Sequence, residues 1–262
     1  MSPPSPVAQR QPVLAARGIH QRFGGVHALR GIDLELFPGE VLALVGDNGA
    51  GKSTLLKILS GNNRPTSGEV LVEGRAHEFK NPAEASAAGI ATVYQDLALA
   101  LDLDVVENMF LGREVSVRGA GRLTGHLDRA LMAKRTREAL DRVHIRIPDI
   151  EARCVDLSGG QRQAVAIARA VTWCDKVLLL DEPTAALGVE QQQEVLNLIT
   201  SIRERLDLAI VLVSHQLSHV LEVADRIAVL RQGRIVRVFD RDEATSSSLV
   251  AAITGLTEGD EE

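Results

Sequence analysis

A glycine-rich stretch, Gly46 to Thr54, has the residue types and spacing of a loop that holds phosphate groups. It reads GDNGAGKST and fits the pattern GxxxxGK[ST]. Glycines let successive backbone N–H groups point at phosphate oxygens, and the start of the following helix adds a favourable field. We expect Lys52 to reach the β and γ phosphates of a nucleotide and the Ser53 hydroxyl to bind Mg²⁺. The nucleotide-binding residues predicted here are Gly46, Asp47, Asn48, Gly49, Ala50, Gly51, Lys52, Ser53 and Thr54.

Two adjacent carboxylates, Asp181 and Glu182, follow the apolar run KVLLL. The carboxyl ends of buried parallel strands are where α/β proteins form their ligand sites. We expect Asp181 to hold the Mg²⁺ shell and Glu182 to take a proton from the attacking water, a role that contributes about 10² to 10⁴ in rate. A carboxylate pair after a strand indicates little alone. Together with the phosphate loop it predicts nucleotide hydrolysis.

A second glycine pair occurs in LSGGQRQAVAIARA. Ser158 is a typical N-cap, and apolar residues recur at helical spacing from Ala164 to Val171. Gly159 and Gly160 leave exposed amides at the positive end of this helix, which favours an anion. From these residues alone, an ordinary turn before a helix is an equal alternative.

The elements that must position these groups alternate as in an α/β fold. A buried strand, Val41 to Val45, runs into the phosphate loop, the helix Lys52 to Leu59 leaves it, and a strand from Val177 to Leu180 leads to the carboxylates. Other predicted strands are 12–23, 28–37, 69–74, 209–213, 226–232 and 234–240, and other predicted helices are 81–89, 127–143, 159–173, 190–206 and 217–223.

Composition limits the class of protein. The chain has 262 residues, enough for a core domain with a subdomain, and 45% of them are apolar. Its formal charge of −6 speaks against a nucleic-acid partner. Cys154 and Cys174 lack the spacing of a metal site and are expected to be free thiols.

Changes in composition and in the predicted elements along the sequence indicate the domain boundaries. Residues 1–12 contain four prolines and are expected to form a flexible tail. The main domain covers 13–240, with a helical subdomain inserted at about 96–157. Residues 241–262 are expected to form a C-terminal helix and an acidic tail.

The order of these motifs resembles that of ATP-binding cassette (ABC) proteins over about Val13 to Phe239. LSGGQRQAVAIARA resembles the family's signature sequence. Gln95 in TVYQD matches the glutamine loop, and His215 in LVSHQ matches the switch histidine. Phe23 in QRFGG lies where the family places an aromatic residue that stacks on adenine. Taken separately, each could be an ordinary surface, strand-end or core residue.

The resemblance implies a fold and a mechanism. The fold is α/β: a P-loop NTPase (RecA-like) core, an antiparallel β subdomain and an inserted α-helical subdomain. Glu182, Gln95 and His215 are the implied catalytic residues, and Gln95 also meets Mg²⁺ and water. The signature of one subunit covers the γ-phosphate held by another, so a head-to-tail homodimer completes two ATP sites. The signature residues implied to bind nucleotide are Ser158, Gly159, Gly160 and Gln161.

One position departs from the family pattern. The family usually places an aspartate a few residues after its catalytic glutamate, where this chain has Gly188 in PTAALGV. A glycine side chain cannot make the aspartate's hydrogen bonds across the dimer. The same substitution is found in bacterial ATPases that import ribose, xylose or fructose, and this chain resembles the single-cassette members of that branch.

That branch implies a function and partners. The expected protein is the ATP-hydrolysing subunit of an ABC importer, bound peripherally to permease subunits at the cytoplasmic face of the cell membrane. A periplasmic sugar-binding protein would supply the sugar. Alternatives are an importer ATPase for amino acids or lipids, and an ABC switch without a transport role. The sequence does not name the sugar.

Other side chains have less specific interpretations. The charged helix at 127–143 is expected to be a solvated face, since acidic and basic residues alternate on it. His126 and His144 have no companions at metal-ligand spacing. Met109 and Phe110 could contact a permease loop or pack in the core.

Overall fold

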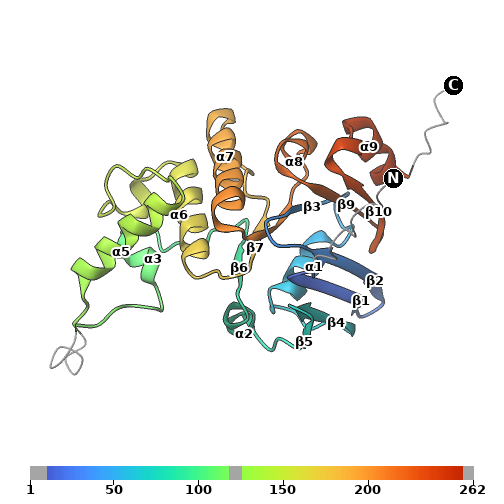
Figure 1. Cartoon of the computed structure of the whole chain (residues 1–262), viewed down its shortest axis with the longest axis horizontal. Helices are drawn as coiled ribbons and strands as arrows, with labels where there is room; N and C mark the ends of the chain where they lie inside the picture. Colours follow the sequence, from blue (N-terminus) through green and yellow to red (C-terminus); the bar gives the residue numbers. More distant parts are fainter. Residues whose placement is uncertain (1–10, 118–125, 256–262) are drawn as a thin grey trace, which may run out of the picture.

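The computed structural model describes residues 11–117 and 126–255. Within them, a six-stranded sheet forms the centre of the molecule (Figure 1). Its strands are β3 (Val41–Val45), β6 (Ile90–Val93), β7 (Val177–Asp181), β8 (Ala209–Val213), β9 (Arg226–Arg231) and β10 (Arg234–Asp240). Their order across the sheet is β10-β9-β3-β8-β7-β6, and neighbours are parallel except β9 and β10.

The strands of this sheet are buried because both of its faces are covered. In β3, Val41, Ala43 and Val45 belong to one hydrophobic core, and Leu42 and Leu44 to the other. All five are inaccessible to solvent. This explains why β3 reads as a continuous apolar run and not as an alternating pattern.

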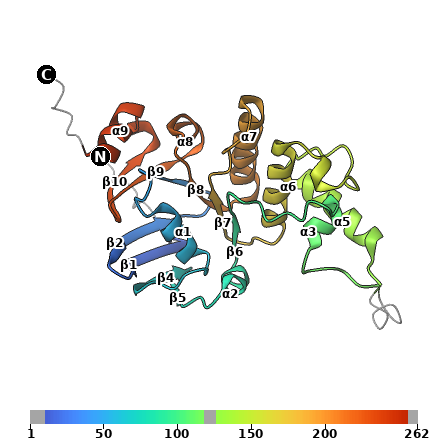
Figure 2. The ribbon, with the colours of Figure 1, turned by 180° about the vertical axis from the view of Figure 1, so that it is seen from behind.

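A smaller antiparallel sheet packs on one face of the centre (Figure 2). Its order is β2-β1-β4-β5, formed by β1 (Leu14–Phe23), β2 (Val26–Leu36), β4 (Ser67–Val72) and β5 (Arg75–His77). Helix α1 (Lys52–Leu59) lies against it, and its buried leucines share a core with Ile19 of β1. The sheet therefore supports the helix that follows the phosphate loop.

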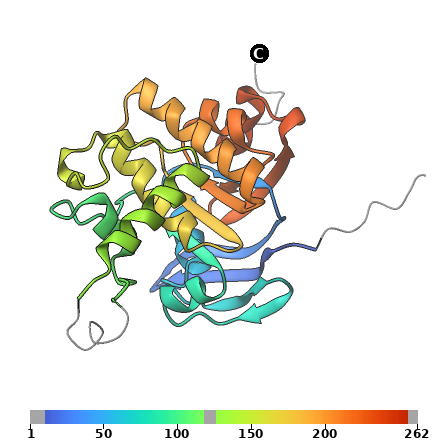
Figure 3. The same cartoon turned by 60° about the vertical axis from the view of Figure 1, so that its left-hand side comes forward.

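A helical part occupies the end of the molecule away from this smaller sheet (Figures 1 and 3). It contains α3 (Val105–Phe110), α5 (Arg129–Arg142) and the start of α6 (Gly159–Thr172). Asp104 and Glu107 form a reciprocal cap at the start of α3.

Six further helical elements complete the described part of the chain. They are the helices α2 (Pro82–Ala87), α7 (Val189–Leu206), α8 (Leu217–Val223) and α9 (Ser246–Thr254) and the 3₁₀ turns η1 (Cys154–Asp156) and η2 (Arg241–Glu243). Helix α7 lies between α6 and α8, and α9 packs on β9 (Figures 1 and 2). None of the helices in the described residues is long and apolar enough to cross a lipid bilayer.

The α/β architecture with two sheets and a helical part is confirmed, with differences in detail. Strands β5 and β6 were not predicted, and β2 begins at Val26, which shortens the first turn to two glycines. Both cysteines are free thiols, as predicted, and both are buried. The predicted flexible tail lies outside the described residues for 1–10, and the predicted acidic tail lies outside them for 256–262.

The permease-contact alternative for Met109 and Phe110 is wrong. Their exposed fractions are only 1% and 2%, and both belong to the larger hydrophobic core. They lie on the inner face of α3, where Phe110 packs edge-on against Trp173. The next residue, Leu111, is exposed.

A buried amide fixes the loop before α3 and gives a stability prediction. The Asn108 side chain accepts a hydrogen bond from the Ala100 N–H (2.9 Å) and donates to the carbonyls of Ala100 (2.9 Å) and Leu103 (3.2 Å). Asn108→Ala leaves the partly buried Ala100 N–H unpaired and removes one bond from each carbonyl, which keep their backbone donors Leu103 and Cys154, so urea unfolding should show a loss of about 2 to 3 kcal/mol. The exposed Asn197→Ala control should stay within about 0.5 kcal/mol of wild type. An equal loss in both variants would contradict this role.

Candidate functional site

The neighbouring parallel strands bring the predicted catalytic segments to one edge of the sheet. The phosphate loop follows β3, Gln95 follows β6, the carboxylates end β7 and His215 follows β8. Since these four strands are adjacent and parallel, their carboxyl ends lie together. The topology alone therefore assembles residues that are far apart in the sequence.

A pocket of about 420 Å³ opens at this edge. It brings together most of the predicted loop with Gln95, both carboxylates and His215. Its lining residues are Ala28, Asn48, Gly49, Ala50, Gly51, Lys52, Ser53, Thr54, Gln95, Asp181, Glu182, Ala185 and His215. Gly46 and Asp47 instead line an adjoining cavity of about 450 Å³, which shares Asn48 and His215 with the first.

Lys52 is buried in the pocket without an ion pair in the described residues. Its ammonium donates to the carbonyls of Gly46 (2.6 Å) and Asp47 (3.0 Å). Burial lowers the pKa of Lys52, and the negative charges of Glu182, Asp47 and Asp181 act in the opposite direction. The loop thus holds a desolvated cation within the pocket.

Two glycines explain the shape of the loop. Gly46 has φ +148°, and a Cβ there would overlap the Leu230 carbonyl of β9. Gly49 has φ +81° with open space where a Cβ would point. The first glycine lets the loop pass close to the sheet, and the second takes a left-handed conformation that residues with a side chain rarely adopt.

The two carboxylates have different environments. Burial raises the pKa of Asp181, and the adjacent charge of Glu182 raises it further. Glu182 has φ +50°, an uncommon conformation for a residue with a side chain, and its N–H donates to the Val213 carbonyl (3.0 Å). Its carboxylate lies 2.8 Å from Nδ1 of His215. Strained backbone of this kind is concentrated at functional sites.

The signature residues begin α6 as expected, with a reciprocal cap. The Gln161 N–H donates to the Ser158 hydroxyl (3.2 Å), and the Ser158 N–H donates to the Gln161 side chain (2.9 Å). A Cβ on Gly159 would meet Leu187, and a Cβ on Gly160 would meet Gln191, each at 3.1 Å. The glycine pair therefore also allows α6 to pack against the segment that begins α7.

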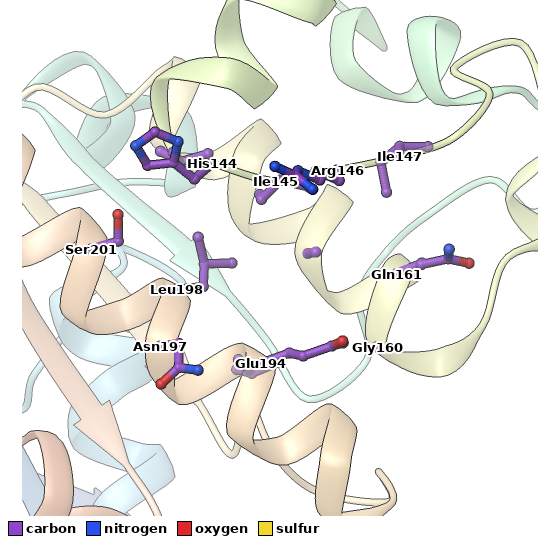
Figure 4. Close-up of a pocket in the computed structure, with 13 residues that line it drawn as sticks. His144, Ile145, Arg146, Ile147, Gly160, Gln161, Glu194, Asn197, Leu198 and Ser201 are labelled. Carbon is purple, nitrogen blue, oxygen red and sulfur yellow. The ribbon is translucent and has the colours of Figure 1, made fainter.

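The signature does not line the phosphate pocket of its own chain. Gly160 and Gln161 line a separate cavity of about 360 Å³ between the residues after α5, the start of α6 and the body of α7 (Figure 4). The predicted residues thus form two groups within one copy, one at the phosphate loop and one at α6.

Phe23 is the predicted nucleotide contact that remains outside both groups. It ends β1, its exposed fraction is 50%, and it does not line the phosphate pocket. Two alanines that the sequence did not single out, Ala28 and Ala185, do line that pocket. Their small apolar side chains carry no chemical signal that could have identified them.

Gly188 is the N-cap of α7 and has ordinary extended angles, φ −68° and ψ 161°. Any residue can adopt these angles, and a Cβ there would meet nothing within 4 Å. Neither backbone strain nor packing within one copy requires glycine at this position.

Comparison with known proteins identifies the family. Residues 29–185 match the family described as "ABC transporter". The chain is 48% identical to the fructose import ATP-binding protein FrcA of Rhizobium meliloti over 95% of this chain and 96% of that protein. The chain belongs to the ABC transporter family.

Other members of the family extend the comparison. The xylose/arabinose import ATP-binding protein XylG of Sulfolobus acidocaldarius is 42% identical over 94% of this chain and 96% of that protein. The ribose import ATP-binding protein RbsA 1 of Rubrobacter xylanophilus is 44% identical over 94% of this chain, which spans 47% of that protein. Among solved structures, a dimeric post-hydrolysis state of the cassette MJ0796 bound to ADP and Pi has a TM-score of 0.71 at 26% identity, covering 87% of this chain and 98% of that one.

The close approach of the loop to β9 gives a prediction for this ABC protein. Gly46→Ala places a methyl group against the Leu230 carbonyl and forces the alanine to positive φ. The loop must shift, so we expect a loss of at least about 2 kcal/mol in urea unfolding and weaker binding of a fluorescent ATP analogue. Gly25→Ala, with no neighbour within 4 Å and no positive φ, is the control. Unchanged nucleotide affinity in Gly46→Ala would refute the assigned role of this glycine.

Proposed function

We propose that this chain is the ATP-hydrolysing subunit of an ABC importer that takes up a sugar. The observation that carries the proposal is the single pocket shared by the phosphate loop, both carboxylates, Gln95 and His215. Sugar as the cargo is supported by relatives named for fructose and for xylose/arabinose import, which align over nearly their whole length.

ATP fits the pocket as substrate. The backbone N–H groups of the loop and the Lys52 ammonium are proposed to bind the β and γ phosphates, and Phe23 is proposed to stack on adenine. On arrival of phosphate, Lys52 exchanges its bonds with the Gly46 and Asp47 carbonyls for bonds with phosphate oxygens. The loop therefore keeps the ammonium in place before the nucleotide binds.

Mg²⁺ is the proposed cofactor. Ser53, Gln95 and Asp181 all line the pocket and offer the oxygen donors that this ion prefers. The described residues contain no cluster of three or more acidic, histidine or cysteine side chains that could hold a metal by themselves. The few oxygen donors of Ser53, Gln95 and Asp181 suit Mg²⁺, because this ion usually completes its coordination shell with water and substrate phosphates. When bound, the ion would neutralise phosphate charge.

Hydrolysis is proposed to use three side chains. Glu182 accepts a proton from the attacking water, Gln95 orients that water, and His215 contacts the γ-phosphate. The 2.8 Å contact between His215 and Glu182 keeps both groups at the same side of the pocket. Positioning and stabilisation of charge supply most of the catalysis in phosphoryl transfer.

The signature residues are proposed to complete the site of a second copy. Ser158, Gly159, Gly160 and Gln161 lie apart from their own phosphate pocket, so two copies arranged head to tail would form two complete ATP sites. Solved relatives include dimeric cassettes. Gly188, in place of the family's aspartate, has no side chain that could hydrogen-bond across this dimer.

The remaining assignments concern the assembly. We propose that 13–240 is the ABC ATP-binding domain, with the helical subdomain at about 96–157 and a C-terminal helix in 241–262. Permease subunits bind it at the cytoplasmic face of the cell membrane, and a periplasmic sugar-binding protein acts through the permease. No nucleic acid is needed as a partner.

Glu182→Gln tests the proposed chemistry. The amide keeps the size of the side chain but cannot accept the proton, so steady-state ATP hydrolysis should fall by at least about 100-fold. Binding of a fluorescent ATP analogue should be retained. Activity equal to wild type would show that Glu182 is not the base.

A pull-down tests the biological function. Tagged Glu182→Gln protein is incubated with ATP and solubilised native membranes, and Lys52→Ala serves as the control that binds ATP weakly. We expect a polytopic permease, encoded beside a sugar-binding protein, with the first variant only. Recovery of soluble machinery without a membrane partner would contradict the importer.

A further inference from the structure

Arg169 lies on α6, the helix that begins with the signature residues, but it does not line the phosphate pocket. Its guanidinium donates to two consecutive backbone carbonyls on another segment, with Nη2 3.0 Å from the Leu97 oxygen and Nη1 3.0 Å from the Ala98 oxygen. Leu97 and Ala98 lie two and three residues after Gln95 in the chain. One rigid fork thus joins the signature helix to the loop that carries Gln95.

The loop has a conformation that depends on such support. Ala98 has φ +49°, in the left-handed region that residues with a Cβ seldom occupy. Its N–H makes only a long bond to the Asp96 carboxylate (3.4 Å). Gln95 itself is exposed at the pocket. The two hydrogen bonds from Arg169 therefore constrain the position of residues 97 and 98 relative to α6.

Arg169 is an unusual residue to find in this place. Burial lowers its pKa, and no carboxylate lies within ion-pair distance of it among the residues that the structure describes. A desolvated guanidinium without a counter-ion is costly and is compensated here by carbonyl bonds. The side-chain hydrogen bonds of Arg169 therefore go to the loop that carries Gln95, and its charge is not paired with a carboxylate of the described residues.

We infer that Arg169 is a positioning residue that makes the placement of Gln95 depend on the placement of α6. This inference rests on the proposed function, in which the start of α6 contacts the nucleotide of the partner copy. Movement of α6 on that contact would be passed through Arg169 to Gln95 in the other ATP site. Each chain then carries a direct link between the two sites.

The geometry requires arginine. A guanidinium presents N–H donors in a fixed planar fork, which matches two neighbouring carbonyls. A lysine ammonium at the end of a flexible stem is a single point and cannot reproduce both bonds with the same constraint. Arg169→Lys keeps the charge and isolates the contribution of the fork.

The test is a double-mutant cycle in ATP hydrolysis. The purified variants are Arg169→Ala, Arg169→Lys, Gln95→Ala and Arg169→Ala with Gln95→Ala. We expect Arg169→Ala to lower kcat by about 3- to 30-fold with KM for ATP changed less than about twofold, because the nucleotide contacts are intact. In the Gln95→Ala background, the second substitution should have no further effect on kcat. Arg169→Lys should restore only part of the rate.

Arg203→Ala is the matched control. Arg203, on α7, also donates to a backbone carbonyl, that of Gly39, and pairs with Asp225, so its loss perturbs structure away from the pocket. Its effect should add to that of Gln95→Ala. Additive effects of Arg169→Ala and Gln95→Ala, like those of the control, would overturn the inference and leave a stabilising role only.

Hydrogen exchange tests the link without catalysis. Amides of 95–100 should exchange faster in Arg169→Ala than in wild type, with little change in β8 and α9. Unchanged exchange in 95–100 would refute the inference even if the protein hydrolyses ATP. Absence of hydrolysis in wild type, with faster exchange in the variant, would instead count against the proposed function alone.

Discussion

The parallel pairing of β6, β7, β8 and β3 is the constraint on which the rest of the structure depends. Each strand ends at the same edge of the sheet and delivers one part of the site: Gln95, the carboxylates, His215 and the phosphate loop. The pairing is held by strands buried on both faces, so the site is built at the edge of the close-packed core.

Charge within the pocket is organised before any ligand binds. Lys52 is desolvated and satisfied by two carbonyls of its own loop, and Asp181 is desolvated beside Glu182. In the proposed function Lys52 only exchanges these carbonyls for phosphate oxygens, so its charge is already in place when a phosphate binds, which is the basis of electrostatic preorganisation. The positive φ of Glu182 is a local strain that the neighbouring β8 stabilises through the Val213 carbonyl.

The parts of the site with fixed local chemistry were predictable from sequence. The phosphate loop and the carboxylates depend on residue types at short spacing, and the cap at Ser158 depends on a residue three positions away. The placement of Gln95 was not predictable in this way, since β6 is only four residues long and was missed. For Met109 and Phe110 the sequence could not decide between core and surface. The side of a short helix that faces the core is decided by the elements that it packs against.

In the proposed assembly, each ATP site is shared between two copies of the chain. The direct measurement is ATP hydrolysis by a mixture of Lys52→Ala and Gly159→Asp proteins, since the first lacks a working phosphate loop and the second places a negative charge at the signature. Each variant alone should be inactive, and the mixture should regain activity because the mixed dimer has one intact site. A mixture as inactive as its components would contradict the shared site.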